Sequence, residues 1–500
     1  TNGVLKATID GNTEKNIDVE KNAAGDKIVK VTYEGAQFAD VQNAVEKDLG
    51  SGKKNAYGGI SRANNATRNN KITLNGTYEN VYGGYTSGTS TTAEGEKNNS
   101  HDNTVTIAGG TVTGKVYGGY TDAAGGKARG NAVTIESAVH DVVGGEGAGE
   151  ATGNTVNVRA NAAAVTGGRS MGAASNNIVN LGNVTVASVT GGEGATTNNN
   201  EVRLNGNARV TGALKGGSQA SGTGNTLNVK GKNNKAGSIE NIQKMNFDAT
   251  GLAKDDTMLE DTNAAGTNVN WANLKASGTA AKPLTLLKNA NGINLTGYTG
   301  AAKSETGETT ETNIDVRKTG STVTEITYEG YQFKGVTQAT TVTEGAVTDT
   351  FGGRSKAGNS TRENTVEVAS GTHTNVYGGW TSGSGSTAAD KDTSYKNTVT
   401  VKGSANVTNT LYGGYTEAAG GKATENTVTV EKDLATANII GGKAAAEASN
   451  NTVNLSNATV NSVTGGDGAT TNNNTVNLNG GANVTGDVKG GTQATGTGNT

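Results

Sequence analysis

An Asn-x-aliphatic-x-aliphatic pattern recurs in the first half of the chain, and its spacing limits the possible folds more than any other feature. The pattern begins seven times, at Asn70, Asn103, Asn131, Asn154, Asn177, Asn200 and Asn225. From Asn131 to Asn200 the spacing is 23 residues each time. A fixed period of about 20 to 50 residues is typical of a solenoid, in which each coil buries its apolar face against its neighbours. The sequence therefore predicts an all-β parallel β-helix (β-solenoid) with coils of about 23–25 residues, arranged in two tandem arrays.

The composition favours an ordered β-rich chain over a disordered one. Apolar residues make up only 32% of the 500 residues, a fraction also found in disordered chains. Disordered chains are usually rich in proline and strongly charged, whereas this chain has one proline, Pro283, and a formal net charge of −3. Its aliphatic residues also alternate with polar ones, as in β-strands. We therefore expect an ordered protein.

Charge, hydropathy and cysteine content argue against several partner classes. The 42 basic and 45 acidic residues give no sign of a clustered basic surface, so we expect no nucleic-acid partner. No apolar run approaches the roughly 18 residues of a membrane helix. The opening stretch, TNGVLKATID, lacks the features of an export signal. The absence of cysteine excludes disulfides and thiolate metal sites.

One coil can be read from the stretch NTVNLSNATVNSVTGGDGATTNN, which begins at Asn451 and restarts at Asn474. Turn residues separate short runs of β-branched residues, which predicts strands of about three to five residues joined by turns. Side chains alternate along a strand, so Val105 and Ile107 share one face with Asn103. If the aliphatic residues form the core, the asparagine is buried with them.

The asparagines in register predict a ladder of side-chain amides inside the solenoid. A buried amide needs hydrogen-bond partners, and coils stacked about 4.8 Å apart let each Asn bond to the Asn of the next coil. Alternatively, each Asn is an ordinary turn residue in the left-handed region. In the second half of the chain the same position is held by Asn364, Asn397, Asn426, Asn451 and Asn474. Both interpretations are structural and imply no chemistry.

A pair of glycines closes each coil, and an aromatic residue precedes several of the pairs. In the first half the pairs begin at Gly58, Gly83, Gly118, Gly144, Gly167, Gly191 and Gly216. Glycine suits either a corner with positive φ or a close approach of stacked backbones. The aromatic residues are Tyr57, Tyr82, Tyr117, Phe351, Tyr377 and Tyr412, which we expect to stack in a column. Such a column serves either packing or the binding of sugar rings.

The chain contains two copies of a larger unit. VTYEGAQF recurs as ITYEGYQF, and matching positions up to Gly144 and Gly441 are 294 to 297 residues apart. From Asn177 and Asn451 onward the offset is 274, smaller by one 23-residue coil. The coil that begins at Asn154 therefore has no equivalent in the second copy. Loss of a whole coil without loss of register favours a solenoid over a sandwich or a closed barrel.

These comparisons predict four parts and about 20 coils in all. Residues 1–57 form a cap-like β segment, and 58–231 form the first β-helix array. Residues 232–345 form a capping or connecting β segment, and 346–500 form the second array.

The VYGGYT and GNTVNV coils, followed by the segment SIENIQKMNFD…DTMLEDT, resemble the passenger regions of large Gram-negative autotransporter adhesins. The resemblance implies a right-handed parallel β-helix exported through a C-terminal outer-membrane barrel. It implies an extracellular position on the cell surface, adhesion to host or bacterial glycans and proteins, and biofilm formation. Neither an export signal nor membrane strands fall within the 500 residues, so we expect a section of a longer protein, with membrane contact only through an anchor outside it.

Few residues suit metal binding. His101, His140 and His373 occupy unrelated coil positions, and we expect each to be a solvated surface residue. The GGEG segment at Gly191 resembles the start of a calcium-binding nonapeptide but lacks the Asp that should follow. We therefore expect no metal site and no cofactor.

Paired carboxylates are the strongest candidates for catalysis. Glu146, Glu150 and Glu193 lie near Gly-rich corners, and two carboxylates held about 5 to 10 Å apart can act as acid and base. In the second copy, however, Lys443 replaces Glu146 and Asp467 replaces Glu193. Such exchanges suit a solvated position, so we expect no enzyme activity.

The leading functional hypothesis is a non-catalytic adhesin passenger that forms a rigid β-solenoid. The first alternative is an extracellular filament built by stacking solenoid units, and the second is a polysaccharide-acting β-helix enzyme. Recognition is expected in two long insertions, TSGTSTTAEGEKNNSH after Tyr85 and TSGSGSTAADKDTSYK after Trp380. The expected partners are surface glycans or proteins, or copies of the chain itself.

Overall fold

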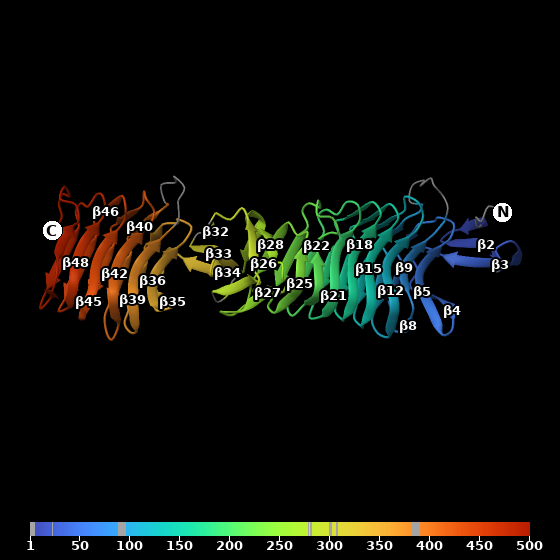
Figure 1. Cartoon of the computed structure of the whole chain (residues 1–500), viewed down its shortest axis with the longest axis horizontal. Coiled ribbons are helices and arrows are strands. Elements are labelled where there is room, and N and C mark those ends of the chain that lie inside the picture. Colours follow the sequence, from blue (N-terminus) through green and yellow to red (C-terminus); the bar gives the residue numbers. More distant parts are fainter. Residues whose placement is uncertain are drawn as a thin grey trace. The chain divides into compact units, whose positions relative to one another are not determined.

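The computed structural model describes residues 6–22, 24–88, 97–278, 280, 283–299, 303–306, 309–382 and 391–500. These residues form strands and turns, with one short 3-10 helix, η1 (Trp271–Asn273). Parallel strands stack coil on coil into a β-solenoid of about 16 turns (Figure 1), which confirms the predicted fold class. The chain divides into two compact units. Unit 1 contains Thr1–Tyr298 and Val316–Thr327, and unit 2 contains Thr299–Asp315 and Tyr328–Thr500.

The coils of unit 1 build three parallel sheets. The first sheet contains β5 (Lys53–Ser61), β9 (Val81–Thr86), β12 (Thr111–Thr121), β15 (Val139–Gly147), β18 (Ala162–Ser170), β21 (Thr185–Glu193), β23 (Arg209–Lys215), β25 (Asn234–Glu240), β27 (Thr257–Asp261) and β30 (Leu284–Lys288), with β8 (Thr77–Tyr78) beside β12. The second contains β7 (Lys71–Leu74), β11 (Thr104–Ile107), β14 (Ala132–Ile135), β17 (Thr155–Val158), β20 (Ile178–Leu181), β22 (Glu201–Asn205), β24 (Thr226–Lys230), β26 (Lys244–Asp248) and β29 (Leu274–Ser277). The third, with the shortest strands, contains β6 (Thr67–Arg68), β10 (Ser100–His101), β13 (Lys127–Arg129), β16 (Glu150–Thr152) and β19 (Ala173–Ser175).

The core lies inside the coils because each strand alternates between buried and outward side chains. In β11, Val105 and Ile107 are fully buried, whereas Thr104 and Thr106 are partly exposed. Residue by residue, β11 pairs with β14 in the next coil, so Val105 lies beside Val133. Aliphatic side chains therefore stack on their equivalents along the array, and each coil buries its apolar face only against its neighbours.

The glycine pairs from Gly58 to Gly191 lie within strands of the first sheet, the Gly216-Gly217 pair directly follows β23, and none of them has a positive φ. Gly83 and Gly84 belong to β9, Gly118 and Gly119 belong to β12, and none of the four has a positive φ. A Cβ on Gly83 would lie 2.2 Å from the Gly118 carbonyl oxygen, and a Cβ on Gly84 would lie 2.6 Å from Nδ2 of Asn103. Close approach is therefore the reason for the glycines, and the alternative of a corner with positive φ is wrong.

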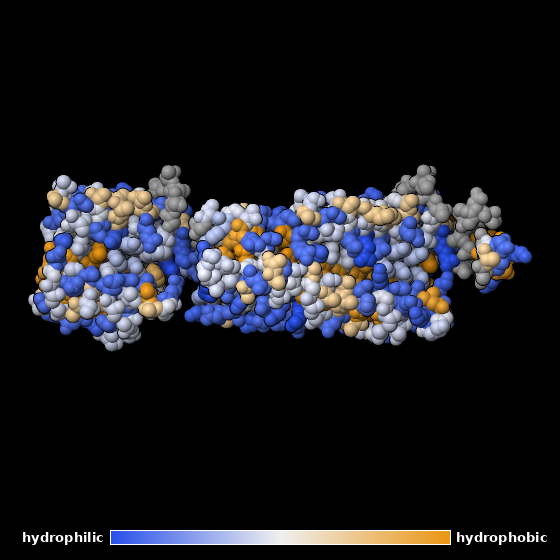
Figure 2. Space-filling model, in the orientation of Figure 1, coloured by the Kyte–Doolittle hydropathy of each residue, from blue (hydrophilic) through white to orange (hydrophobic). Residues whose placement is uncertain are grey.

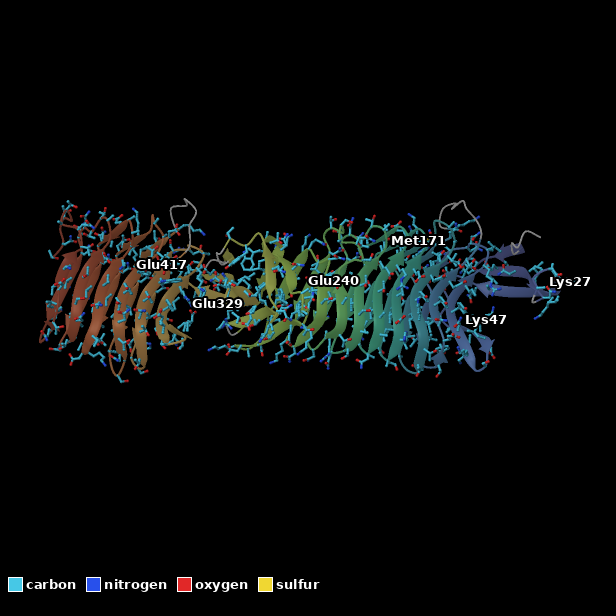
Figure 3. The ribbon with its side chains drawn as sticks, viewed as in Figure 1. Lys27, Lys47, Met171, Glu240, Glu329 and Glu417 are labelled. Carbon is cyan, nitrogen blue, oxygen red and sulfur yellow. The ribbon has the colours of Figure 1, made fainter. Side chains whose placement is uncertain are left out.

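Antiparallel strands precede the coils of unit 1. β1 (Lys6–Asp10), β2 (Thr13–Lys21) and β3 (Ile28–Gln37) form a small sheet in that order. β4 (Val45–Gly50) pairs antiparallel with β5. Figure 3 shows Lys27 at the tip of the β2–β3 hairpin and Lys47 on β4.

The segment from residue 232 onward begins by continuing the coils. β25, β26, β27, β29 and β30 pair in parallel with strands of earlier coils, and Met258, Leu259 and Leu286 extend the buried core. β28 (Thr267–Asn270) and β31 (Ile293–Thr296) form a separate parallel pair. Beside them, the ring of Trp271 packs edge-on against Tyr298 at 5.0 Å.

Unit 2 repeats the three-sheet arrangement. Its first sheet contains β35 (Thr340–Glu344), β36 (Val347–Ser355), β39 (Thr372–Thr381), β42 (Asn406–Thr416), β45 (Leu434–Lys443), β48 (Thr459–Asp467), β50 (Asn483–Val484) and β51 (Val488–Gly491). The second contains β38 (Thr365–Val368), β41 (Thr398–Val401), β44 (Thr427–Val430), β47 (Thr452–Ser456) and β49 (Thr475–Asn479). The third contains β37 (Thr361–Arg362), β40 (Thr393–Tyr395), β43 (Lys422–Thr424) and β46 (Glu447–Ser449).

The number of coils is smaller than the sequence predicts because part of the chain lies outside them. β1 to β4 are antiparallel, and so are β32 (Lys303–Thr306) with β33 (Thr310–Thr319), and β35 with β36. β34 (Thr322–Gln332) follows β33 in the order of its sheet. These segments account for the difference between about 20 predicted coils and about 16 observed turns.

Candidate functional site

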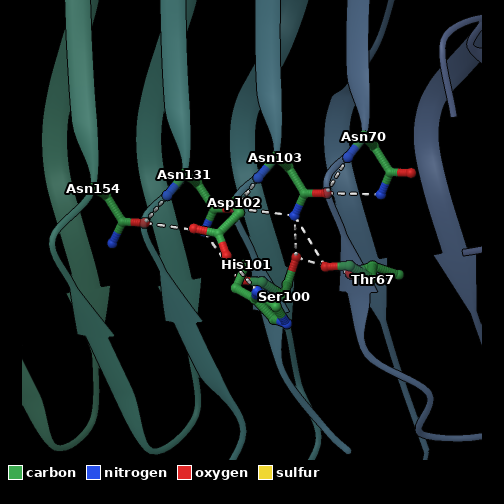
Figure 4. A network of polar contacts seen from close by, with 8 residues as sticks. All are labelled: Thr67, Asn70, Ser100, His101, Asp102, Asn103, Asn131 and Asn154. Atoms are coloured by element: carbon green, nitrogen blue, oxygen red, sulfur yellow. Dashed lines mark hydrogen bonds and ion pairs between the residues drawn. The ribbon is translucent and has the colours of Figure 1, made fainter. Parts of the chain in front are cut away.

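The predicted asparagines form a continuous ladder of hydrogen bonds in each unit. In unit 1, Nδ2 of each Asn donates to Oδ1 of the next, from Asn70 to Asn225, at 2.7 to 3.2 Å. In unit 2 the same bonds run from Asn364 to Asn474 at 2.7 to 3.0 Å. Figure 4 shows four rungs, Asn70, Asn103, Asn131 and Asn154. All twelve predicted asparagines are buried.

The interior rungs satisfy their amides completely, as Asn131 shows. The Asn131 side chain donates from Nδ2 to Oδ1 of Asn154 and to the carbonyl of Ser100, both at 3.0 Å. Its Oδ1 accepts from the backbone N–H of Asn103 at 3.1 Å and from Nδ2 of Asn103 at 2.9 Å. Two donors and two acceptor sites are thus all used, as burial requires. The ladder is closed to any ligand.

The ladder has two further members that the Asn-x-aliphatic-x-aliphatic pattern does not include. Asn499 continues the second ladder, accepting from Nδ2 of Asn474 at 3.0 Å. Gln243 ends the first ladder, since its Oε1 accepts from the backbone N–H of Asn225 at 3.0 Å. The sequence signal for Asn499 is the pair Asn499-Thr500, which matches Asn225-Thr226. Gln243 carries no repeat signal.

The residue before each rung, and not the rung itself, adopts the left-handed conformation. In unit 1 these residues are Asn69, Asp102, Gly130, Gly153, Asn176, Asn199 and Gly224, with φ between 54° and 71°. In unit 2 they are Glu363, Lys396, Glu425, Asn450, Asn473 and Gly498, with φ between 54° and 68°. Gly, Asn and Asp tolerate this region, whereas Glu and Lys adopt it at a cost. The interpretation of the ladder asparagines as left-handed turn residues is therefore wrong.

A buried carboxylate, absent from the sequence-based candidates, joins the antiparallel sheet of unit 1 to its first coil. Glu14 of β2 is fully buried. Its two oxygens accept from Asn16 Nδ2 at 2.5 Å, Ser61 Oγ at 2.8 Å, the Arg62 backbone N–H at 2.7 Å and Asn65 Nδ2 at 3.0 Å. Four hydrogen bonds offset the desolvation of a buried charge. We call this arrangement the carboxylate cradle.

Unit 2 contains the same cradle around Glu311. This carboxylate accepts from Asn313 Nδ2 at 2.6 Å and from Ser355 Oγ, the Lys356 backbone N–H and Asn359 Nδ2, each at 2.7 Å. The repeated motifs TEKNI and TETNI, with S-x-A-x-N near the end of the first long strand, were the sequence signal for both cradles. Every acceptor position is occupied, so the cradles are structural features and not catalytic carboxylates.

The predicted aromatic column is present in both units and has a second row beside it. Tyr57, Tyr82 and Tyr117 stack with centroids 5.0 to 5.1 Å apart, and Tyr85 stacks on Tyr120 at 5.3 Å. In unit 2, Phe351, Tyr377 and Tyr412 stack at 5.0 Å, with Trp380 and Tyr415 beside them. We call each set an aromatic strip.

Stacking leaves few ring faces free for a sugar. Both faces of Tyr82 are covered, by Tyr57 on one side and Tyr117 on the other. Burial raises the pKa of Tyr120 to about 12 and also raises the pKa of Tyr82 and Tyr117, so their hydroxyls stay protonated at neutral pH. The geometry therefore favours packing over sugar stacking and leaves the hydroxyls as polar groups of the strip.

The candidate catalytic glutamates lie on strands and form ion pairs with basic residues of neighbouring strands. Arg169 lies between Glu146 and Glu193, with Nη1 3.3 Å from the first carboxylate and Nε 2.7 Å from the second. Burial opposes its charge, but the hydrogen bond and charge of Glu193, together with Glu146, raise the pKa of Arg169. Glu150 pairs with Lys127 at 2.9 Å, and this hydrogen bond lowers the pKa of its carboxyl. Each of the three carboxylates is thus engaged by a basic neighbour, and Glu146 and Glu193 share Arg169.

Two of the three histidines are buried, which makes the expectation of solvated surface residues wrong for them. His101 is buried, with Nδ1 2.7 Å from the Asp102 carboxylate. His373 is buried, with Nδ1 2.8 Å from Thr350 Oγ1 and Nε2 3.0 Å from the Ser370 carbonyl. Only the His140 side chain is largely exposed. Within the described residues no group of His, Asp or Glu is placed to hold a metal ion.

Unit 2 places an arginine at the start of its aromatic strip. The Arg354 guanidinium lies 4.4 Å from the ring centroids of both Phe351 and Tyr331 and 5.3 Å from that of Trp380. A small open pocket of about 210 Å³ adjoins it and is also lined by Glu344 and Asp349. The acidic rim and the ring contacts of Arg354 make this a packed surface and not a defined ligand site.

The outer surface is polar, with scattered apolar patches on the face drawn in Figure 2. Outward side chains such as Glu240 and the highly exposed Met171 project from it (Figure 3). Half of each predicted recognition insertion (residues 89–96 and 383–390) lies outside the described residues.

Comparison of the chain with protein-family models, with curated proteins and with solved structures gave no significant match. Across the described ranges, no helix has the length and apolar character needed to cross a membrane.

Proposed function

We propose that this chain is a non-catalytic adhesin passenger, a β-solenoid scaffold that displays outward side chains for attachment to glycans or proteins on other cells. One observation supports this most: the interior is constant from coil to coil, whereas the outward rows change. In the row that contains Tyr120, successive coils place Glu146, Arg169 and Glu193. A constant core with variable outward positions suits recognition over an extended surface.

The resemblance of the coils to autotransporter passengers supports the same proposal. It adds an extracellular position on the surface of a Gram-negative bacterium, attachment to host or neighbouring cells, and a contribution to biofilms. In this proposal the solenoid is the displayed part, and an anchor outside these residues holds it at the membrane.

Attachment can be tested by displaying the whole chain on a non-adherent bacterium through an unrelated anchor. Cells would be counted on immobilised mucin-type glycans, on extracellular-matrix protein and on bare glass. We expect at least about tenfold more attached cells on one biological surface than with the anchor alone. Attachment equal to that of the anchor on every surface would sink the proposal.

A structural filament is the second candidate, and it is favoured by β3, which among the described residues is the last strand of the sheet β1-β2-β3. Electron microscopy of the purified chain separates the two functions. Single particles that still support attachment agree with an adhesin, whereas particles joined end to end without attachment indicate a filament. Release of reducing ends from polysaccharides would instead indicate an enzyme.

A further inference from the structure

The small sheet at the start of unit 1 exposes a row of large apolar side chains. On β3, Val29, Val31 and Tyr33 are 61%, 65% and 67% exposed, and on β2 Ile17 is 43% exposed. Ile17 lies directly opposite Tyr33, so these residues share one face of the sheet. Apolar (orange) atoms are visible on this sheet at the right-hand end of Figure 2. Exposed apolar faces of this kind mark interaction sites.

β3 is also an edge strand. In the part of the chain that the structure describes, its sheet has the order β1-β2-β3, with β2 as the neighbour of β3. An edge strand offers backbone N–H and C=O groups to an incoming strand. The exposed face and the open edge therefore belong to the same strand.

The second copy of the repeat shows what occupies the equivalent strand. Residues 27–32 match 322–327 of β34 at an offset of 295. In the sheet order β34 lies between β33 and β30, the last coil strand of the first array. The backbone N–H of Asn289 donates to the Thr324 carbonyl at 3.0 Å, and Lys288 Nζ lies 3.6 Å from the Glu325 carboxylate.

Burial changes completely at the matching position. Ile326, the equivalent of Val31, has no exposed surface, whereas Val31 is 65% exposed. The neighbouring strand β30 has the sequence LTLLK, and Leu284, Leu286 and Leu287 are all buried. The position equivalent to Val31 is therefore buried where a leucine-rich strand, β30, lies beside it.

We propose that β3 is a docking edge for the last coil of a further array of this same repeat, which adds a strand of the β30 type. β30 of this chain is already paired with β34, so the occupant is an array whose own last strand is open. Docking would add main-chain hydrogen bonds along β3 and cover Val29, Val31 and Tyr33, as strand addition does in other complexes. This inference does not depend on the adhesive role.

Charge distinguishes the expected occupant from β30 itself. Lys30 stands at the position of Glu325, which pairs with Lys288. A strand that docks on β3 should therefore carry an acidic residue where β30 carries Lys288, because like charges directly opposite destabilise a strand pair.

A peptide-binding measurement on the whole chain tests the proposal. The probes are fluorescent peptides with the sequence of residues 283–291, PLTLLKNAN, and with Lys288→Glu, PLTLLENAN. Fluorescence anisotropy should show saturable binding of the acidic peptide, at least about threefold tighter than the basic one. Val31→Thr together with Tyr33→Thr should weaken binding at least about tenfold. The matched control is Leu49→Thr, a 46% exposed apolar residue on the edge strand β4, which should leave binding unchanged.

Hydrogen exchange gives a second readout that does not depend on the variants folding. Addition of the acidic peptide should slow amide exchange in residues 27–37 and leave β35 unchanged. Absence of saturable binding, equal binding by the Val31→Thr/Tyr33→Thr variant, or protection spread over β35 would each overturn the proposal.

Discussion

The two arrays have the same interior and different exteriors. The bond from Asn131 to Asn154 is 3.0 Å long, and so is the bond from Asn426 to Asn451, although the second array lacks a coil at this point. Outside, the first array has the column Glu146, Arg169 and Glu193, whereas the second has Lys443 followed by Asp467. Both columns alternate in charge, and Lys443 lies 3.1 Å from Asp467.

This difference shows how a solenoid tolerates the loss of a coil. Removal of the Arg169 coil alone would place Glu146 beside a second carboxylate. The exchange of Glu for Lys at residue 443 restores an attractive pair. The interior needs no adjustment because each interior rung makes the same bonds to whichever coil follows.

The largest expected effect is the loss of a ladder rung. We expect Asn131→Leu, and equally Asn426→Leu, to lower the free energy of unfolding by about 4 kcal/mol. Each substitution removes four hydrogen bonds and leaves the buried polar groups that made them without a partner. Hydrogen exchange of the flanking strands measures this loss in each array separately. Thr134→Ala, on the outward face of β14, is the control and should cost less than about 0.5 kcal/mol. An unaffected array would contradict the equivalence of the two interiors.

The glycine pairs give the next effect. Gly83→Ala and Gly413→Ala should each cost about 3 kcal/mol, since the new Cβ would lie 2.2 Å or 2.3 Å from a backbone carbonyl oxygen of the next coil. Gly420→Ala is the matched control, because nothing lies within 4 Å of its Cβ position and its φ is not positive. Urea unfolding followed by circular dichroism measures all three. Equal tolerance at the three sites would show that the coils can separate at no cost.

A smaller effect, a gain in stability, is expected at a position where the residue that precedes a ladder asparagine differs between the two arrays. Glu425 has φ 57°, and its equivalent in the first array is Gly130. Glu425→Gly should stabilise the second array by about 0.5 to 1 kcal/mol by relieving a left-handed non-glycine residue. Loss of its 3.8 Å pair with the exposed Lys396 should matter little. Thr427→Gly, two residues later in β44, should instead destabilise it, and thermal unfolding separates the two outcomes.

The charge columns give the smallest effect. Lys443→Glu should destabilise the second array by about 0.5 kcal/mol, because the partly exposed side chain would face Asp467. The loss should shrink in 1 M salt, and the double change Lys443→Glu with Asp467→Lys should recover it. A loss that is independent of salt would mean that packing, and not charge, sets this position.

The sequence predicts the features that depend on neighbouring coils. Fixed spacing of the asparagines and alternation around Val105 and Ile107 identify the core and the strands because each coil contacts its equivalent. For the glycine pairs the sequence leaves a corner and a close approach equally open, because a glycine pair is also a common turn signal, and only the stacked backbones decide for the close approach. The sequence does not predict the Glu14 cradle because the partners Ser61 and Asn65 lie 47 and 51 residues away along the chain. The burial of His101 and His373 depends on contacts that a single histidine does not encode.

The ladder also gives each array a direction. Along the first array, the backbone N–H of Val41 donates to Oδ1 of Asn70, every later amide donates the same way, and Gln243 accepts the last bond. The side-chain dipoles are therefore aligned, and aligned bonds polarise one another and strengthen by about 10–30% each. A rung in the middle is polarised from both sides, whereas a terminal rung is polarised from one. Cohesion should thus grow with each added coil, and an array should fray from its ends.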